Sequence, residues 1–201
     1  MAIPSLQSII GDIDIYLLDQ ILKGRYKKDE LLLDAGCGNG RNLTWFLQNN
    51  LLVYGIDRDL VAIQELKERV ADLDTAKFMV SEIENTPFGD NYFDHIICSA
   101  VLHFAKGKEH FQRMCAELVR VLKPNGSIFI RMTSNIGIED KVVLIDDGVY
   151  FLPDESTRFL LTKPLLASFM KQNQLSFLEP LKTVNVDDIR CMSTLVLQKF
   201  S

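Results

Sequence analysis

Two kinds of apolar pattern alternate along the chain: short apolar runs, and longer stretches in which apolar residues recur every three or four positions. The runs are typical of buried strands and the periodic stretches of helices. The runs predict strands at 31–35, 51–57, 77–81, 93–99 and 127–132. The periodic stretches predict helices at 10–21, after residue 40, at 59–72, at 108–122 and after Thr162. This alternation favours an α/β sheet with parallel strands.

The C-terminal pattern breaks the alternation. Two last strands are expected near 176–184 and 192–200, and the polar loop 185–190 between them is too short for a crossover helix. Such a pair must run antiparallel. We therefore expect one domain over residues 1–201, an α/β fold with a doubly wound, mostly parallel seven-stranded sheet and one antiparallel strand.

Charge and cysteine usage narrow the class of protein. With 22 Lys plus Arg against 27 Asp plus Glu, the net charge is −5, which gives no global attraction to nucleic acid or anionic membrane. No apolar run approaches the ~18 residues of a membrane span, and no signal peptide is evident. The cysteines are Cys37, Cys98, Cys115 and Cys191, and their spacing is not that of a metal site, so we expect no metal. We expect the four thiols to be reduced and buried, which fits a cytoplasmic location.

The strongest local signal is the glycine-rich segment Asp34-Ala35-Gly36-Cys37-Gly38-Asn39-Gly40, which follows the first strand. Ligands of open α/β sheets bind at the carboxyl ends of the strands, where glycines let the backbone approach them. The spacing is G-x-G-x-G, and position 41 is Arg, so neither the dinucleotide fingerprint nor the P-loop fits. A carboxylate at Asp34 suits a ligand that carries an ammonium or sulfonium group.

A second acidic residue ends the second strand. Asp57 lies 21 positions after Gly36, where an acid can accept both hydroxyls of a ribose. The alternative is that Asp57 caps the following helix. Asp59 could serve as that cap, which would leave Asp57 for the ligand.

Five segments in order carry a resemblance to a known family: 32–40, 54–57, 81–88, 93–103 and 118–127. Over residues 31–133 the chain resembles the class I S-adenosylmethionine-dependent methyltransferases, most of all their small-molecule branch. The resemblance implies a Rossmann-like fold, S-adenosyl-L-methionine as cofactor and a small-molecule acceptor methylated by in-line displacement. We also expect a monomer or homodimer with no nucleic-acid or membrane partner. The chain departs from the family in having Glu82 where Asp is commoner and Thr86 where Leu precedes Pro.

The resemblance also implies roles for residues. Asp34 and the glycine turn would hold the methionine amino group, Asp57 the ribose, and Glu82 with Ile83 the adenine. Arg58 would lie beside the adenine, and Ser99 would meet the methionine part. The candidate cofactor-binding residues are thus Asp34, Gly36, Cys37, Gly38, Asn39, Gly40, Asp57, Arg58, Glu82, Ile83 and Ser99.

The acceptor side is less defined. Residues 1–30, as an N-terminal helix or lid, and 134–160, as an insertion, are expected to build it. Arg131, Tyr150 and Arg158 could contact the acceptor, with a solvated rim as the alternative. Tyr16, Arg25 and Tyr26 could belong to the lid. His103 is the candidate general base, against a purely packing or hydrogen-bonding role.

Other functions stay open. The chain lacks the D/N-P-P-Y/F element that amide-nitrogen and nucleobase methyltransferases often carry after the fourth strand. A methyltransferase for tRNA or protein remains an alternative, as does a binding or regulatory subunit without its own turnover. An NAD-dependent oxidoreductase fits the α/β pattern but conflicts with Asp34 and Arg41.

Overall fold

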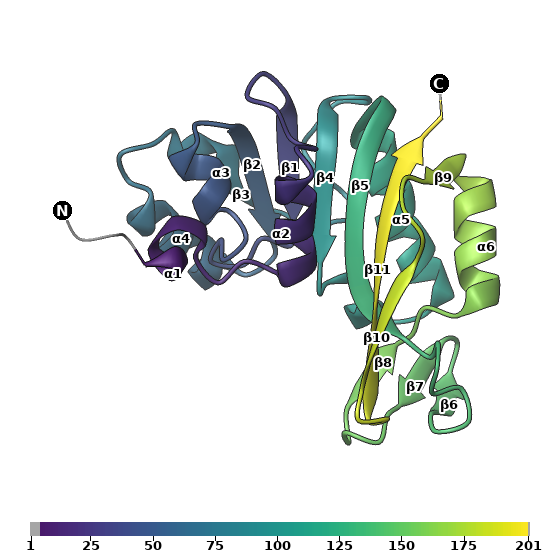
Figure 1. The fold of residues 1–201 in the computed structure, drawn as a ribbon. Coiled ribbons are helices and arrows are strands. Elements are labelled where there is room, and N and C mark those ends of the chain that lie inside the picture. The colour runs from purple at the N-terminus through teal and green to yellow at the C-terminus, as the bar shows by residue number, and fades with distance from the viewer. Residues whose placement is uncertain (1–4, 201) are drawn as a thin grey trace.

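The predicted strands form one sheet in the computed structural model, which describes residues 5–200 (Figure 1). Its strands are β1 (Leu31–Ala35), β2 (Leu52–Asp57), β3 (Phe78–Val80), β4 (Phe93–Ser99), β5 (Leu122–Ser134), β9 (Leu175–Phe177), β10 (Lys182–Val186) and β11 (Arg190–Lys199). The order is β10-β11-β5-β4-β1-β2-β3, and β9 also pairs with β11. The α/β fold class is confirmed.

The antiparallel strand is β11, which pairs antiparallel with β5, β9 and β10. The strand expected near 176–184 is broken into β9 and β10, so eight strands fill seven positions. The strand predicted at 127–132 begins earlier, at Leu122, with an irregular start in which the register against β4 shifts.

Helices cover both faces of the sheet. They are α1 (Leu6–Ile10), α2 (Ile15–Leu22), α3 (Thr44–Gln48), α4 (Leu60–Arg69), α5 (Lys108–Val121) and α6 (Lys163–Gln172), with short 3-10 turns η1 (Thr75–Lys77) and η2 (Leu102–Phe104). The helix expected at 10–21 begins only at Ile15, because Gly11 turns the chain with φ 64° and Asp14 caps α2 by accepting from the Tyr16 N–H; the residues before this turn form the separate short helix α1.

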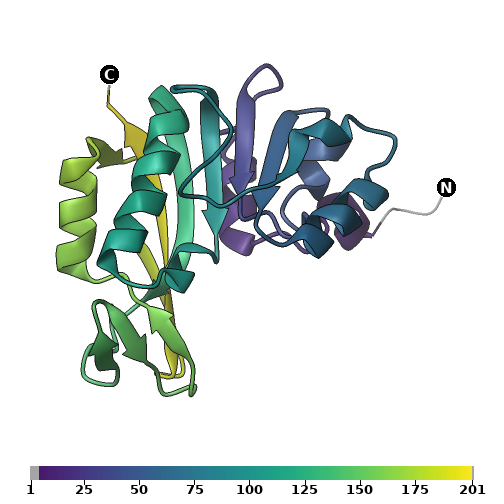
Figure 2. The same ribbon diagram turned by 180° about the vertical axis from the view of Figure 1, so that it is seen from behind.

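The core lies on the two faces of the sheet. Phe111 and Leu118 of α5 pack with Phe169 of α6 on one face, where Figure 2 shows the two helices side by side. Leu17 of α2 and Phe46 of α3 belong to a second apolar cluster with α4. The apolar periodicity of each helix therefore faces the sheet, as expected for buried stripes.

The insertion at 134–160 forms a small antiparallel sheet, which the sequence analysis did not predict. Its strands are β6 (Val143–Asp146), β7 (Val149–Phe151) and β8 (Thr157–Phe159). It lies beyond the end of the main sheet at which β4 terminates (Figure 1). Asp147, in the β6–β7 turn, accepts from the Lys108 N–H at 2.9 Å. It thus caps α5, since Gly107, which precedes the first residue of this helix, has no side chain to do so.

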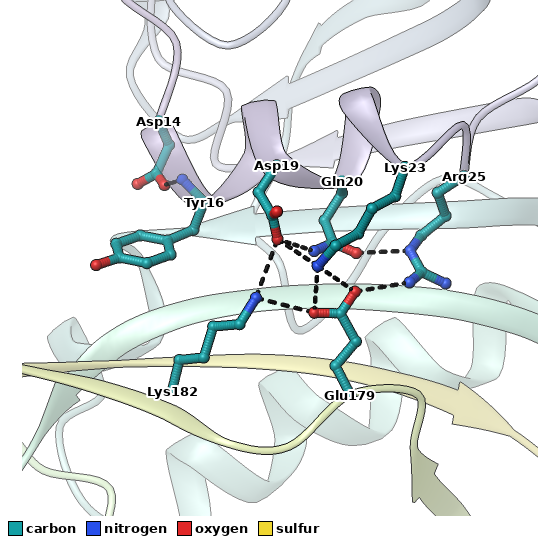
Figure 3. Close-up of polar contacts among 8 residues, drawn as sticks. All are labelled: Asp14, Tyr16, Asp19, Gln20, Lys23, Arg25, Glu179 and Lys182. Carbon is teal, nitrogen blue, oxygen red and sulfur yellow. Dashed lines mark hydrogen bonds and ion pairs between the residues drawn. The ribbon is translucent and has the colours of Figure 1, made fainter.

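Ion pairs hold α2 against the sheet (Figure 3). Lys23 and Lys182 each contact Asp19 and Glu179 at 2.6 to 3.0 Å. Arg25 also contacts Glu179, at 3.2 Å. Residues 1–30 were expected to form a helix or lid. Residues 1–4 lie outside the described part of the chain, and the ion pairs fix α2 to the segment between β9 and β10.

Two further expectations can be compared with the fold. All four cysteines are buried. Within residues 5–200, no helix combines the length and apolar character required to cross a bilayer.

Candidate functional site

The glycine turn is tied to the second strand. The Gly36 and Cys37 N–H groups donate to the Ile56 carbonyl at 2.8 and 2.9 Å. At Gly36, with φ 82°, an added Cβ would lie 2.3 Å from the Val101 side chain. At Gly38, with φ 53°, an added Cβ would meet nothing within 4 Å. The helix expected directly after the turn begins only at Thr44, so the turn itself, rather than a helix N-terminus, presents the backbone here.

Asp34 is the most unusual group of the turn. It is 0% exposed, and neither carboxyl oxygen has a hydrogen-bond partner within the described residues. Burial raises the pKa of Asp34 to about 7, against the opposing charge of Arg41 and with a further increase from Asp57. A buried carboxylate without a partner is costly unless a cation or donor reaches it. The turn therefore has the chemistry of a site for a cationic group.

Asp57 is held by the backbone on both sides. Its oxygens accept from the Gly38 N–H at 2.8 Å and the Asp59 N–H at 2.9 Å. Asp59 caps α4 by accepting from the Val61 N–H, so the expectation about this cap is confirmed. Asp57 is nevertheless already an acceptor of two bonds. Each oxygen keeps a second lone pair with which to bind a ligand hydroxyl.

A cleft of about 290 Å³ opens beside the turn. Of the expected cofactor-binding residues, those on its wall are Gly36, Asp57, Arg58, Glu82 and Ile83. Those that do not line it are Asp34, Cys37, Gly38, Asn39, Gly40 and Ser99. The rest of its wall is Asp59, Ser81, Glu84, Ala100, Val101, Phe104, His110 and Met114. The sequence analysis therefore located one wall of the cleft and missed the wall formed by η2 and α5.

His110 and Glu84 join the two walls. The His110 Nδ1 accepts from the Lys106 N–H at 3.0 Å, so its Nε2 carries the ring proton and donates to Glu84 Oε1 at 3.0 Å. The signal for His110 was its place in the first turn of a predicted helix. Its partner lies 26 residues earlier, so periodicity could not reveal the pair.

Arg131 and Ser99, at the ends of β5 and β4, both contact Asp14. The Arg131 Nη1 donates to Asp14 Oδ2 at 2.8 Å, and the Ser99 Oγ donates to the same oxygen at 3.4 Å. The Arg131 guanidinium also lies 5.2 Å from the centre of the Tyr16 ring. The expected acceptor clamp at Arg131 is thus already engaged by α2, through an acid that the sequence analysis did not single out.

His103 is buried next to the cleft residue Phe104. Its Nδ1 accepts from the Thr133 N–H at 3.4 Å. Burial, together with Arg158, Arg190 and Arg131, lowers the pKa of His103 to about 4, so the ring is neutral at pH 7.

The remaining candidates lie in different places. Tyr150 and Arg158 are cross-strand partners in β7 and β8, and neither lines the cleft. Arg25 belongs to the ion-pair network of α2. Tyr26 is buried, with its ring 5.1 Å from that of Phe46 and from that of His95. Tyr26 is therefore a core residue and not part of an exposed lid.

Comparisons with known proteins agree with this geometry. Residues 33–130 match the family described as "Methyltransferase domain". An uncharacterized methyltransferase, YodH, of Bacillus subtilis is 31% identical over 55% of this chain and 43% of its own length. The tRNA (carboxymethyluridine(34)-5-O)-methyltransferase of Arabidopsis thaliana is 31% identical over 50% of this chain and 23% of its own. The match thus spans less than half the length of these two relatives.

A solved structure extends the likeness to nearly the whole chain. A SAM-dependent methyltransferase from Methanosarcina mazei superimposes with a TM-score of 0.74 at 17% identity, over 90% of this chain and 97% of that one. At such identity the likeness concerns the fold. Together with the family match over residues 33–130, it confirms the resemblance stated above, to the class I S-adenosylmethionine-dependent methyltransferases.

Proposed function

We propose that this protein transfers a methyl group from S-adenosylmethionine to a small-molecule acceptor. The observation that carries the proposal is the buried carboxylate of Asp34, unpartnered within residues 5–200, behind a glycine turn whose backbone at Gly38 borders open space. The ammonium of the methionine part would supply the missing partner of this carboxylate. S-adenosylmethionine supplies the reactive chemistry, a methyl group activated by a sulfonium.

Residues that line the cleft fit the remaining parts of this cofactor. Asp57 would accept from the ribose hydroxyls with the lone pairs that Gly38 and Asp59 leave available. Glu82 and Ile83 would line the adenine, with Arg58 at its edge. The protein's remaining task is to align the acceptor with the methyl and sulfur for in-line displacement, since alignment is the main requirement of such a step.

We assign His103 to positioning rather than to proton abstraction. With Nδ1 accepting from Thr133, the ring proton of the neutral imidazole lies on Nε2, which leaves no lone pair free to act as a base. An acceptor that reacts without losing a proton first, or that is already deprotonated, would need no base at this place.

A second candidate function is methylation of tRNA. It is favoured by relatives such as the Arabidopsis enzyme, whose name states a tRNA substrate. Against it stands the net charge of −5, because binding to a polyanion normally needs a surplus of Lys and Arg. The small acceptor is therefore the first choice.

Titration calorimetry with S-adenosylhomocysteine tests the cofactor assignment, with NAD as the comparison ligand. We expect binding of S-adenosylhomocysteine only, and at least tenfold weaker binding by Asp34→Asn. Asp72→Asn, at an exposed position after α4, is the matched control and should bind as the unaltered protein does. Absence of binding would refute the proposal.

Transfer of labelled methyl groups tests the acceptor. The isolated chain is supplied with labelled S-adenosylmethionine and, separately, with small amines, thiols and carboxylic acids, or with total tRNA. Label in a small compound supports the first candidate, and label in tRNA only supports the second. Binding of the cofactor without any transfer would favour a regulatory subunit.

A further inference from the structure

An arginine lies on the outer side of the cleft wall. Phe104 of η2 lines the cleft and is 49% exposed. The guanidinium carbon of Arg158, on β8, is 5.2 Å from the centre of the Phe104 ring. Stacking of this kind strips water from one face of a guanidinium and leaves its N–H groups directed outward along its edge.

Arg158 forms no ion pair within residues 5–200. Against the effect of burial, the Asp154 carboxyl is near enough for the charge of Arg158 to lower its pKa, after the hydrogen bonds from Ser156 and the charge of Arg190. The Arg158 Nη1 donates a hydrogen bond to the Thr157 carbonyl at 2.7 Å. Other arginines of the chain, such as Arg113, Arg120 and Arg131, contact an acid at 2.6 to 2.8 Å. Arg158 therefore keeps most of its hydrogen-bonding capacity in a partly buried place.

A second arginine adds positive charge at the same place. Arg190, which begins β11, forms an ion pair with Asp154 at 3.8 Å. Asp154 lies between β7 and β8, so this contact joins the small sheet to the main sheet and brings both arginines to that junction. Burial, Arg158, Arg190 and Arg131 together lower the pKa of the nearby His103. Two arginines against the single carboxylate of Asp154 leave a positive charge here, in a chain of net charge −5.

We propose that Arg158, stacked on Phe104 and supported by Arg190, binds the carboxylate or phosphate of an anionic methyl acceptor. This inference rests on the proposed function, because the bound anion is taken to be the acceptor of the methyl group. The guanidinium edge matches the two oxygens of either group, and fixing both oxygens sets the orientation of the molecule that carries them. The exposed face of Phe104 would receive an apolar or planar part of the same acceptor.

Three related probes test the charge requirement: benzoate, phenyl phosphate and neutral benzamide. Binding is measured by saturation-transfer NMR titration, with and without S-adenosylhomocysteine. We expect benzoate or phenyl phosphate to bind at least tenfold more tightly than benzamide, and the stronger of the two identifies the anionic group. Benzamide binding equal to that of both anions would overturn the proposal.

Variants test the residue. Arg158→Gln should weaken binding of the anion at least tenfold, since it removes a charged hydrogen-bond donor. Arg158→Lys keeps the charge without the planar edge and should fall between the two. Arg113→Gln, on the exposed side of α5, is the matched control and should change nothing. Equal anion binding by Arg158→Gln and the unaltered protein would contradict the inference.

The outcomes separate this inference from the proposed function. Arg158→Gln should bind S-adenosylhomocysteine with an unchanged dissociation constant, because Arg158 does not line the cleft. Cofactor binding without anion binding would refute only the anionic acceptor. Failure of the unaltered protein to bind the cofactor, while the anions still bind through Arg158, would refute the proposed function and leave an anion site without an assigned reaction.

Discussion

Replacing Asp34 by Asn should make the protein without ligand more stable, although the same change is expected to weaken the binding of S-adenosylhomocysteine. The pKa of Asp34 rises from 3.8 to about 7 on folding because the carboxylate is buried. A folded-state pKa above the unfolded value means that stability is fully present below pH 3.8 and is lost as the pH rises to about 7. Each pKa unit corresponds to about 1.4 kcal/mol, so ionised Asp34 costs about 4 kcal/mol at pH 7.5.

The amide introduced by Asp34→Asn would carry no charge, but its own unpaired polar atoms cost about 1–3 kcal/mol. We therefore expect this variant to raise the free energy of unfolding by about 1–3 kcal/mol at pH 7.5. The difference from the unaltered protein should change by about 2–3 kcal/mol between pH 5 and pH 7.5.

Urea unfolding followed by circular dichroism at both pH values measures this difference. Asp72→Asn is the control for the loss of a charge at an exposed position, and its effect should not depend on pH in this range. The reasoning is refuted if Asp34→Asn is less stable than the unaltered protein at pH 7.5, or if its effect is the same at both pH values.

Three further changes have expected results of defined size. Asp57→Ala should weaken S-adenosylhomocysteine binding by about 1.5–3 kcal/mol in calorimetry, and an unchanged dissociation constant would exclude the ribose role. Asp147→Ala should lower the free energy of unfolding by about 1 kcal/mol, as loss of a helix cap does, and a neutral result would show that the bond to Lys108 contributes nothing. Glu179→Gln should destabilise the protein by about 1–3 kcal/mol in urea unfolding, an effect that shrinks in high salt; equal loss at all salt concentrations would contradict an electrostatic origin.

The central strands and helices could be predicted because each contains its own pattern of buried apolar residues. The strands at 31–35 and 93–99 have the predicted bounds, and the helix predicted at 108–122 differs from α5 by one residue. Buried runs and apolar stripes are local properties, so periodicity finds them. The acidic residues at the ends of β1 and β2 were found for the same reason, since each belongs to the end of a recognisable strand.

The small sheet escaped prediction because its burial is not local. All four residues of β6 are exposed, so Val143–Asp146 has no alternation of buried and exposed positions to detect. The sequence did contain a turn signal, because Asp147-Gly148 between two β-prone segments is typical of a hairpin. In the structure both residues have positive φ. The missed cleft residues His110 and Glu84 depend on how α5 packs, which one sequence does not state.

The cap that Asp147 places on α5 links the small sheet to one wall of the cleft. Its carboxylate comes from a turn 39 residues further along the chain, so the first turn of α5 is capped only while the small sheet is docked. That turn of α5 carries His110, whose bond to Glu84 shapes the far wall of the cleft. A ligand that moves the small sheet would thereby change the affinity of the cleft for its own ligand, and the cleft ligand would change the affinity of the first by the same factor.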